Sequence, residues 1–123
     1  MKSLILVAHG SRREASNQEI RELTRTLASK AGDAFDQISC AFLELAEPSI
    51  PDGIEQAVGA GANEVVVLPY FLSAGRHVAE DIPALVSGKR EEYPQVDIRI
   101  APYLGKADAV TDVLLAVAHV GQR

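Results

Sequence analysis

The feature that most constrains the fold is a regular alternation of short apolar runs with longer segments in which apolar residues recur at helical spacing. Four runs have the length and composition of buried strands: 3–8, 35–43, 65–68 and 96–101. Four segments show apolar residues three or four positions apart: 20–31, 50–58, 78–86 and 110–117. The predicted order is therefore strand then helix, four times over.

This order predicts an α/β fold in which parallel strands are joined by right-handed crossovers. We expect an open, doubly wound, four-stranded parallel sheet flanked by helices on both faces, with the flavodoxin-like strand order 2-1-3-4. The length of 123 residues suits one domain, covering residues 1–123, with a single core.

Residues that start and stop helices mark the expected boundaries. Gly32 is expected to end the first helix. Ser49 and Asp52 form a possible capping box for the second helix. Asp81 is the expected cap of the third helix, because Pro83 then falls in the first turn and His77 stays in the preceding loop or a short turn.

Charge and composition exclude several classes of protein. With 12 Lys and Arg against 17 Asp and Glu, the net charge of −5 argues against a nucleic-acid surface, and three Phe, three Tyr and no Trp offer no platform for stacking bases. No apolar run approaches the roughly 18–20 residues of a membrane-spanning helix, and the start lacks a signal-peptide pattern, so a cytoplasmic location is expected. The single cysteine, Cys40, excludes an intramolecular disulfide and a multi-cysteine zinc site; we expect a buried, inert thiol.

Polar residues follow each predicted strand at the point where ligands bind in such sheets. His9 follows the first strand, Glu44 and Glu47 the second, the 69–77 loop the third, and Tyr103 and Lys106 the fourth. His9 and His77 should therefore project toward one rim, where with Glu44 they could bind a divalent metal ion. The alternative is that each histidine only fixes loop backbone groups. His119, on the last helix, is expected to be structural or solvent-facing.

Basic residues gather at the same predicted rim despite the acidic whole: Arg12, Arg13, Arg76 and Lys106. Guanidinium groups recognise carboxylates and phosphates through paired hydrogen bonds, so a bound polyanion would explain them. The alternative is that Arg12 and Arg13 are only solvated residues at a helix start, and that Gly10 and Gly75 simply serve turns. The residues alone predict a metal-plus-anion site and leave the reaction open.

Three ordered blocks carry a family resemblance. The blocks VAHGSR, FLELAEPSI and VVVLPYFLSAGRHVAEDIP resemble those of the short-form CbiX sirohydrochlorin chelatases, which are ferrochelatase-like class II chelatases. The resemblance implies a lyase that inserts a divalent metal, typically Co²⁺, into the tetrapyrrole sirohydrochlorin during cobalamin (vitamin B12) biosynthesis, with no cofactor beyond the metal substrate. Insertion of Fe²⁺ for siroheme or Ni²⁺ for coenzyme F430 is the alternative.

The resemblance also implies roles for individual residues. His9 and His77 match the metal-binding and catalytic pair, and Glu44, the first Glu of the FLELAEPSI block, matches an acidic partner in catalysis. The segments that would bind the tetrapyrrole comprise Ser11, Arg12, Ser73, Ala74, Gly75 and Arg76. Larger chelatases of this class contain two similar halves around a cleft, so a chain of this size is expected to form a homodimer.

Two rival functions remain open on the sequence. Histidine phosphate-transfer enzymes also place His-Gly after the first strand, but they usually need Arg directly before the histidine, where this chain has Ala8. A carrier that binds metal or tetrapyrrole without catalysis would use the same rim residues. A phosphoacceptor domain is disfavoured because no acidic pair follows the first predicted strand.

Overall fold

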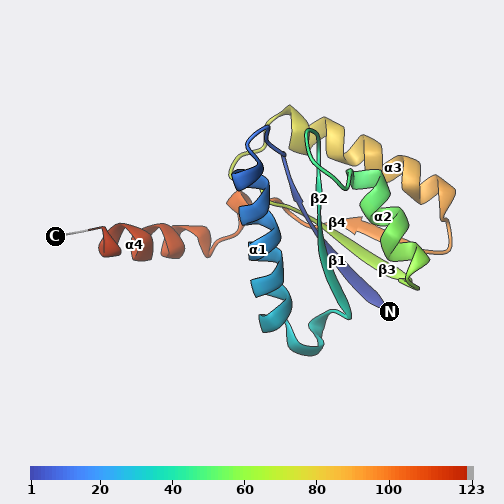
Figure 1. Ribbon diagram of the computed structural model, residues 1–123, viewed down its shortest axis with the longest axis horizontal. Coiled ribbons are helices and arrows are strands. Elements are labelled where there is room, and N and C mark those ends of the chain that lie inside the picture. The colour runs from blue at the N-terminus through green and yellow to red at the C-terminus, as the bar shows by residue number, and fades with distance from the viewer. Residues whose placement is uncertain (122–123) are drawn as a thin grey trace.

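A four-stranded parallel sheet forms the centre of the computed structural model, which describes residues 1–121 (Figure 1). Its strands are β1 (Lys2–Ala8), β2 (Gln37–Phe42), β3 (Glu64–Pro69) and β4 (Asp97–Ile100). All neighbouring strands are parallel, and their order is β2-β1-β3-β4. The predicted fold class and strand order are confirmed.

Within residues 1–121, four helices and three short helical turns accompany the strands, and the last helix and the third turn follow the last strand. The helices are α1 (Glu14–Lys30), α2 (Ile50–Gly59), α3 (Ile82–Glu92) and α4 (Val110–Val120). The turns are η1 (Gly32–Ala34), η2 (His77–Asp81) and η3 (Leu104–Lys106), of which η2 has π-helical geometry and runs directly into α3. The first helix is longer than the apolar repeat predicted, because its opening turn is polar.

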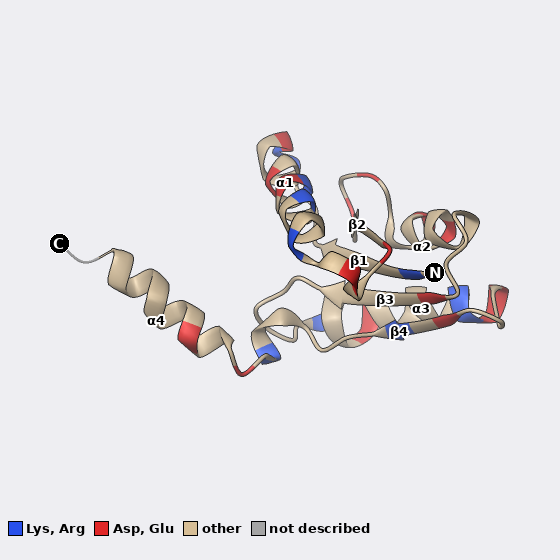
Figure 2. Ribbon diagram, turned by 90° about the horizontal axis from the view of Figure 1, so that it is seen from below, with Lys and Arg blue, Asp and Glu red and all other residues tan. Residues whose placement is uncertain are grey.

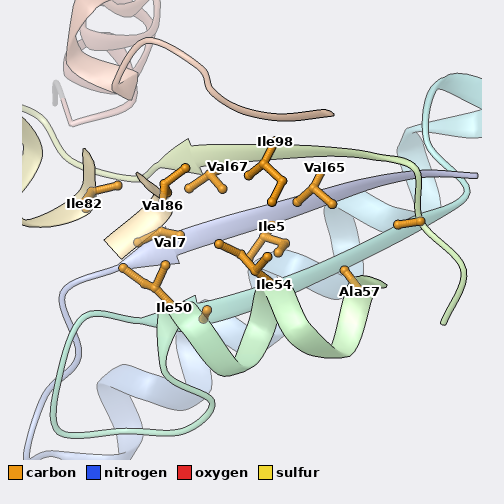
Figure 3. Packing of buried hydrophobic residues seen from close by; sticks show 12 residues of the cluster. Ile5, Val7, Ile50, Ile54, Ala57, Val65, Val67, Ile82, Val86 and Ile98 are labelled. Atoms are coloured by element: carbon orange, nitrogen blue, oxygen red, sulfur yellow. The ribbon is translucent and has the colours of Figure 1, made fainter. Parts of the chain in front are cut away.

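The core lies between the sheet and the pair α2 and α3. On β1, Ile5 and Val7 point toward this side and pack against residues of both helices (Figure 3). The cluster consists of aliphatic side chains almost completely removed from water, among them Ile50, Ile54, Val65, Val67, Ile82, Val86 and Ile98. The opposite side of the sheet is covered by α1 near Phe42, over whose ring the Arg21 guanidinium lies at 5.5 Å. One face of the sheet is therefore covered by α2 and α3, and the other face is covered by α1.

The helix boundaries test the capping predictions. The Ser49 side chain accepts a hydrogen bond from the Asp52 amide at 3.2 Å, which confirms Ser49 as the N-cap of α2. Pro83 lies in the first turn of α3, as predicted. The prediction for Asp81 is wrong: it has helical backbone angles and makes no capping bond, because η2 continues into α3 and leaves no free helix end there.

The last helix, α4, does not pack on the sheet with the other three helices. Both views show α4 extending away from the body of the molecule (Figures 1 and 2). Every residue from 111 to 120 is exposed. The turn that leads into α4 is closed by hydrogen bonds of its own, such as that from the Val110 amide to the Ala107 carbonyl at 3.1 Å, and it directs the helix outward.

Two further predictions concern solvent access. Cys40 is half-buried rather than buried, because it lies on β2, the strand at the edge of the sheet. His119 is exposed on α4, as one of the two expected possibilities. Within residues 1–121, no helix is both long and apolar enough to cross a membrane.

Candidate functional site

The carboxyl ends of the central strands bring the two predicted histidines together. His9 directly follows β1, and His77 opens η2 after the loop that follows β3. Their ring centroids are 4.8 Å apart, with the ring planes inclined at 55°. Both side chains are a little over 40% exposed, so they are accessible to a ligand while still held by the loops. The predicted convergence of these residues, 68 positions apart in the chain, is thus confirmed.

Hydrogen bonding fixes the orientation of the His9 ring. Its Nδ1 lies 3.0 Å from the Gly10 carbonyl, which can only accept, so Nδ1 carries the proton. The other nitrogen, Nε2, lies 3.1 Å from Oε1 of Glu44. Two lone pairs facing each other repel, so this contact is favourable only when a proton or a metal cation lies between them. The pair is therefore built to hold a cation or to pass a proton.

Gly10 is what allows His9 and Glu44 to approach. Its φ of +93° is in the region that favours glycine, and a Cβ here would lie 1.8 Å from the Glu44 carbonyl oxygen. The Glu44 amide also donates to the His9 carbonyl at 3.0 Å, which ties the two loops together. The next residue, Leu45, has a φ of 65°, an uncommon backbone conformation for leucine at the turn that presents Glu44.

His77 is oriented by a carboxylate on its own helix. Its Nδ1 donates to Oδ2 of Asp81 at 2.8 Å, one turn further along. A carboxylate that accepts a hydrogen bond from one imidazole N–H fixes the tautomer of the ring. It also makes the other ring nitrogen more basic, and so a better ligand for a metal ion. Nε2 of His77 is then the nitrogen left to bind a metal, as it is in His9.

A hollow of about 360 Å³ opens beside this group. Glu44, His77 and Asp81 supply its polar wall, and Leu43, Ala84 and Leu85 supply its apolar wall. An apolar surface with a few convergent polar groups is typical of sites that bind organic ligands.

The loop after His9 is held by a buried asparagine. The Asn17 side chain accepts from the Ser11 amide at 2.9 Å and donates to the Ser11 carbonyl at 2.8 Å, and it is only 2% exposed. The Ser11 hydroxyl in turn accepts from the Arg13 amide at 3.0 Å. Ser11 thus has a fixed position at the rim, while Arg12 and Arg13 lie exposed in the same loop.

The second predicted binding segment is an open loop. Ser73, Ala74 and Gly75 are all exposed, and nothing lies within 4 Å of a Cβ placed on Gly75, so no close approach of backbone requires glycine there. Arg76 is 81% exposed and lies 3.5 Å from Glu80 on its own helical turn. Lys106 lines a different hollow, beside Leu68 and Tyr103, and is not part of the histidine group.

Within residues 1–121, no group of three or more His, Cys, Asp and Glu side chains is arranged to hold a metal ion by itself. The three expected residues form instead a linked series, in which Glu44 contacts His9 and the His9 ring faces that of His77. Two imidazole nitrogens and one carboxylate can hold a metal ion only with further ligands from another molecule.

Sequence reasoning missed Asp81, Asn17 and the steric role of Gly10. The four-residue spacing of His77 and Asp81 was a usable signal, because residues i and i+4 share a helix face. No comparable signal marked Asn17, since an asparagine within a helix is ordinarily a surface residue. Gly10 and Glu44 lie in two loops that are far apart in the sequence, and no sequence pattern shows that these loops are in contact.

Comparisons with known proteins find related sequences over most of the chain. The model of the CbiX family matches residues 3–119. The chain is 39% identical over 111 residues to the chloroplastic sirohydrochlorin ferrochelatase of Arabidopsis thaliana, covering 90% of this chain and 48% of the relative. It is 37% identical over 86 residues to the sirohydrochlorin cobaltochelatase of Methanococcus maripaludis, covering 70% and 58%. The chain thus spans about half the length of these curated relatives.

Solved structures show the same fold. The putative cobalamin biosynthesis CbiX protein from Marinobacter aquaeolei superposes with a TM-score of 0.84 at 30% identity, covering 98% of this chain and 97% of that one. The sirohydrochlorin chelatase SirB from Bacillus subtilis subspecies spizizenii, in complex with cobalt, superposes with a TM-score of 0.84 at 26% identity, covering 96% and 50%.

Proposed function

The chain belongs to the CbiX family, and on that premise we propose that it is a sirohydrochlorin chelatase, which inserts a divalent metal ion into the tetrapyrrole sirohydrochlorin. The observation that carries the proposal is the pair of facing imidazoles, 4.8 Å apart, each with its Nδ1 proton already engaged. Both rings therefore offer Nε2, the ligand that first-row divalent metals accept readily.

The metal is cargo in this reaction, so the chain must bind it and also release it. Closed sites with four protein ligands hold metal ions tightly and serve structural roles. His9 and His77 provide a partial ligand set, and the ring nitrogens of the substrate would complete and then replace it. An incomplete site of this kind favours transfer over storage.

Insertion replaces two pyrrole N–H protons by one metal ion, so two protons must leave the ring. We assign Glu44, which contacts His9 at the wall of the hollow, to accept these two protons one after the other. It would pass each proton to solvent, to which its side chain is 52% exposed. We assign His9 and His77 to metal delivery and Glu44 to proton removal.

The carboxylate side chains of sirohydrochlorin would meet the basic rim. Arg12 and Arg76 are exposed, and a guanidinium binds a carboxylate through two parallel hydrogen bonds. Ser11, held by Asn17, and the open segment 73–75 would supply hydroxyl and backbone donors. The apolar wall of the hollow would contact the ring edge.

We assign Co²⁺ as the metal and cobalamin biosynthesis as the pathway, with Fe²⁺ or Ni²⁺ insertion as the alternative. Related proteins carry both the names cobaltochelatase and ferrochelatase, so family membership supports chelation more strongly than the choice of metal. Imidazole and carboxylate ligands accept all three ions.

We further propose that two copies associate with their rims face to face. The hollow is open to solvent in one copy, and the chain matches about half the length of several relatives. A twofold axis through the rim would enclose the tetrapyrrole between two equivalent surfaces.

The test is to mix the purified protein with sirohydrochlorin and, separately, Co²⁺, Ni²⁺ or Fe²⁺, and to follow the change in tetrapyrrole absorption against the uncatalysed rate. We expect acceleration with turnover beyond one equivalent, and its loss in His9→Ala and His77→Ala. His119→Ala is the matched control, because this exposed histidine lies far along α4, and it should keep full activity. No acceleration with any metal would overturn the proposal, and a single equivalent bound without turnover would identify a carrier.

A further inference from the structure

Leu45 combines two features that lower the stability of the free protein. Among residues 1–121 it is the only residue other than glycine with a positive φ, which is 65°. In this conformation the Cβ atom lies too close to the following carbonyl oxygen, so glycine or asparagine ordinarily occupies it. The side chain is also 53% exposed, which leaves about half of an apolar surface in water. Neither feature gains anything for the fold.

The backbone conformation at this position is explained by the residue before it. The Glu44 amide donates to the His9 carbonyl at 3.0 Å, and Glu44 Oε1 lies 3.1 Å from His9 Nε2. The turn at Leu45 comes directly after these contacts and leads the chain toward Ser49, the N-cap of α2. Glycine or asparagine would make the same turn with less strain. The turn therefore accounts for the positive φ, and the presence of leucine needs another reason.

Exposed apolar side chains gather in the loops that carry the candidate site. Within residues 1–109, the large apolar side chains that are exposed are Met1, Leu23, Leu45, Tyr70 and Leu72. Three of these five belong to the site loops: Leu45 follows Glu44, and the other two lie between β3 and His77. Exposed apolar groups that cluster in this way mark a surface that a ligand or partner covers.

The hollow described above lies beside the same loop. Leu43 and Glu44, the two residues before Leu45, line it together with His77. Figure 1 shows the loop that follows β2 next to the start of α3, whose residues supply the other wall. The imidazole rings of His9 and His77 are only 4.8 Å apart, and a tetrapyrrole macrocycle is much wider than this. A macrocycle seated over both rings would therefore extend across the flanking loops.

We infer that Leu45 is a substrate-contact residue, whose side chain packs on the apolar surface of the tetrapyrrole ring. The charged groups of this substrate lie at its periphery, where Arg12 and Arg76 would bind them, and the ring itself needs apolar contacts. Leu45 loses its exposure only when the ring covers it, so the stability lost in the free protein is recovered as affinity. This inference rests on the proposed chelatase function and adds a residue that recognises the ring.

The first experiment measures the Kd for metal-free sirohydrochlorin by absorption titration. Leu45→Ala keeps a positive φ and removes the side chain beyond Cβ. Covering the exposed half of a leucine is worth about 10-fold in affinity, so the Kd should rise about 10-fold. Leu45→Met stays apolar and should bind like the wild type. Leu23→Ala is the matched control, since it removes the same atoms from an exposed leucine in the middle of α1, and its Kd should not change.

The second experiment separates contact with the ring from support of the loop. Leu45→Asn has a side chain of similar length that tolerates a positive φ, so its urea unfolding midpoint should be higher than that of the wild type. Its Kd should nevertheless rise about 10-fold. At saturating sirohydrochlorin its insertion rate should match that of the wild type, because a contact made equally before and during insertion changes binding alone. A residue that only holds the loop would lose stability and affinity together.

Each outcome decides a separate claim. An unchanged Kd in Leu45→Ala and Leu45→Asn removes Leu45 from the binding surface, while metal insertion by the wild type would still support the chelatase proposal. A lower unfolding midpoint in Leu45→Asn shows that the leucine supports the fold, and an equal loss of affinity in Leu23→Ala shows a general effect; either result overturns the inference. A wild type that neither binds sirohydrochlorin nor inserts metal overturns both proposals.

Discussion

Replacing Gly10 by alanine tests whether the close approach of two loops builds the site. Gly10 has a φ of +93°, and its backbone lies against the Glu44 carbonyl. Alanine at a positive φ costs about 1–2 kcal/mol of folding free energy. The added Cβ would also lie 1.8 Å from that oxygen, where real Cβ contacts are essentially never below 3.0 Å, so one loop must move by at least the 1.2 Å difference.

The displacement falls on the residues that we assign to metal delivery and proton removal. Glu44 is bonded to His9 through its amide at 3.0 Å and faces the His9 Nε2 at 3.1 Å, so neither loop can shift without separating or reorienting the pair. A misplacement of about 1 Å in an active site can lower the rate by about 100-fold. We therefore expect Gly10→Ala to lower metal insertion about 100-fold and to lower the unfolding free energy by more than the backbone cost alone.

Gly61→Ala is the matched control. Gly61 has a φ of +109° but nothing within 4 Å of its Cβ position, so it has the backbone cost without the collision. Urea unfolding and insertion rates would be measured on both variants. If Gly10→Ala and Gly61→Ala lose the same stability and the same activity, the contact with Glu44 does not position the site and the reasoning is refuted.

Three other predictions follow from single contacts. Asp81→Asn keeps an acceptor for His77 Nδ1 but loses its charge, so insertion should fall about 10- to 100-fold with the fold intact by circular dichroism; an unchanged rate would remove Asp81 from the site. The hydrogen bond from Arg21 lowers the pKa of the Glu14 carboxyl group. Arg21→Met should raise that pKa toward its ordinary value, which an NMR titration would measure. In the wild type, the stability that this pair adds should be lost as the pH falls through the lowered pKa of Glu14. Ser49→Ala should cost about 1 kcal/mol in urea unfolding, whereas Ser29→Ala, away from any helix start, should cost less.

The sequence predicted the fold well because the core is aliphatic and regular. The runs around Ile5 and Val66 are buried on both sides of the sheet, so their composition alone identified them as strands. The placement of α4 could not be predicted in this way. Apolar spacing shows that Val113 and Val117 need a covering surface, but it does not tell whether that surface belongs to the same copy.

For the site, topology predicted that His9 and His77 lie at one edge of the sheet, and the short sequence motifs led to the proposal of a tetrapyrrole substrate. The sequence did not predict the contacts of the site side chains with one another and with the backbone of other segments. Asp81 looked like a cap because acidic residues are common at helix starts, and only the π-helical turn of η2 shows that its carboxylate turns to His77 instead. Lys106 follows its strand as expected, yet η3 carries it to another hollow.

The most direct test of the central claim is a double-mutant cycle on the insertion rate. If His9 and His77 hold the same metal ion, each alanine variant removes the function of the pair, and the double variant should be no slower than the slower single variant. Rates would be measured with sirohydrochlorin and Co²⁺ under single-turnover conditions. Two losses that simply multiply in the double variant, or full activity in either single variant, would contradict delivery of one metal ion by this pair.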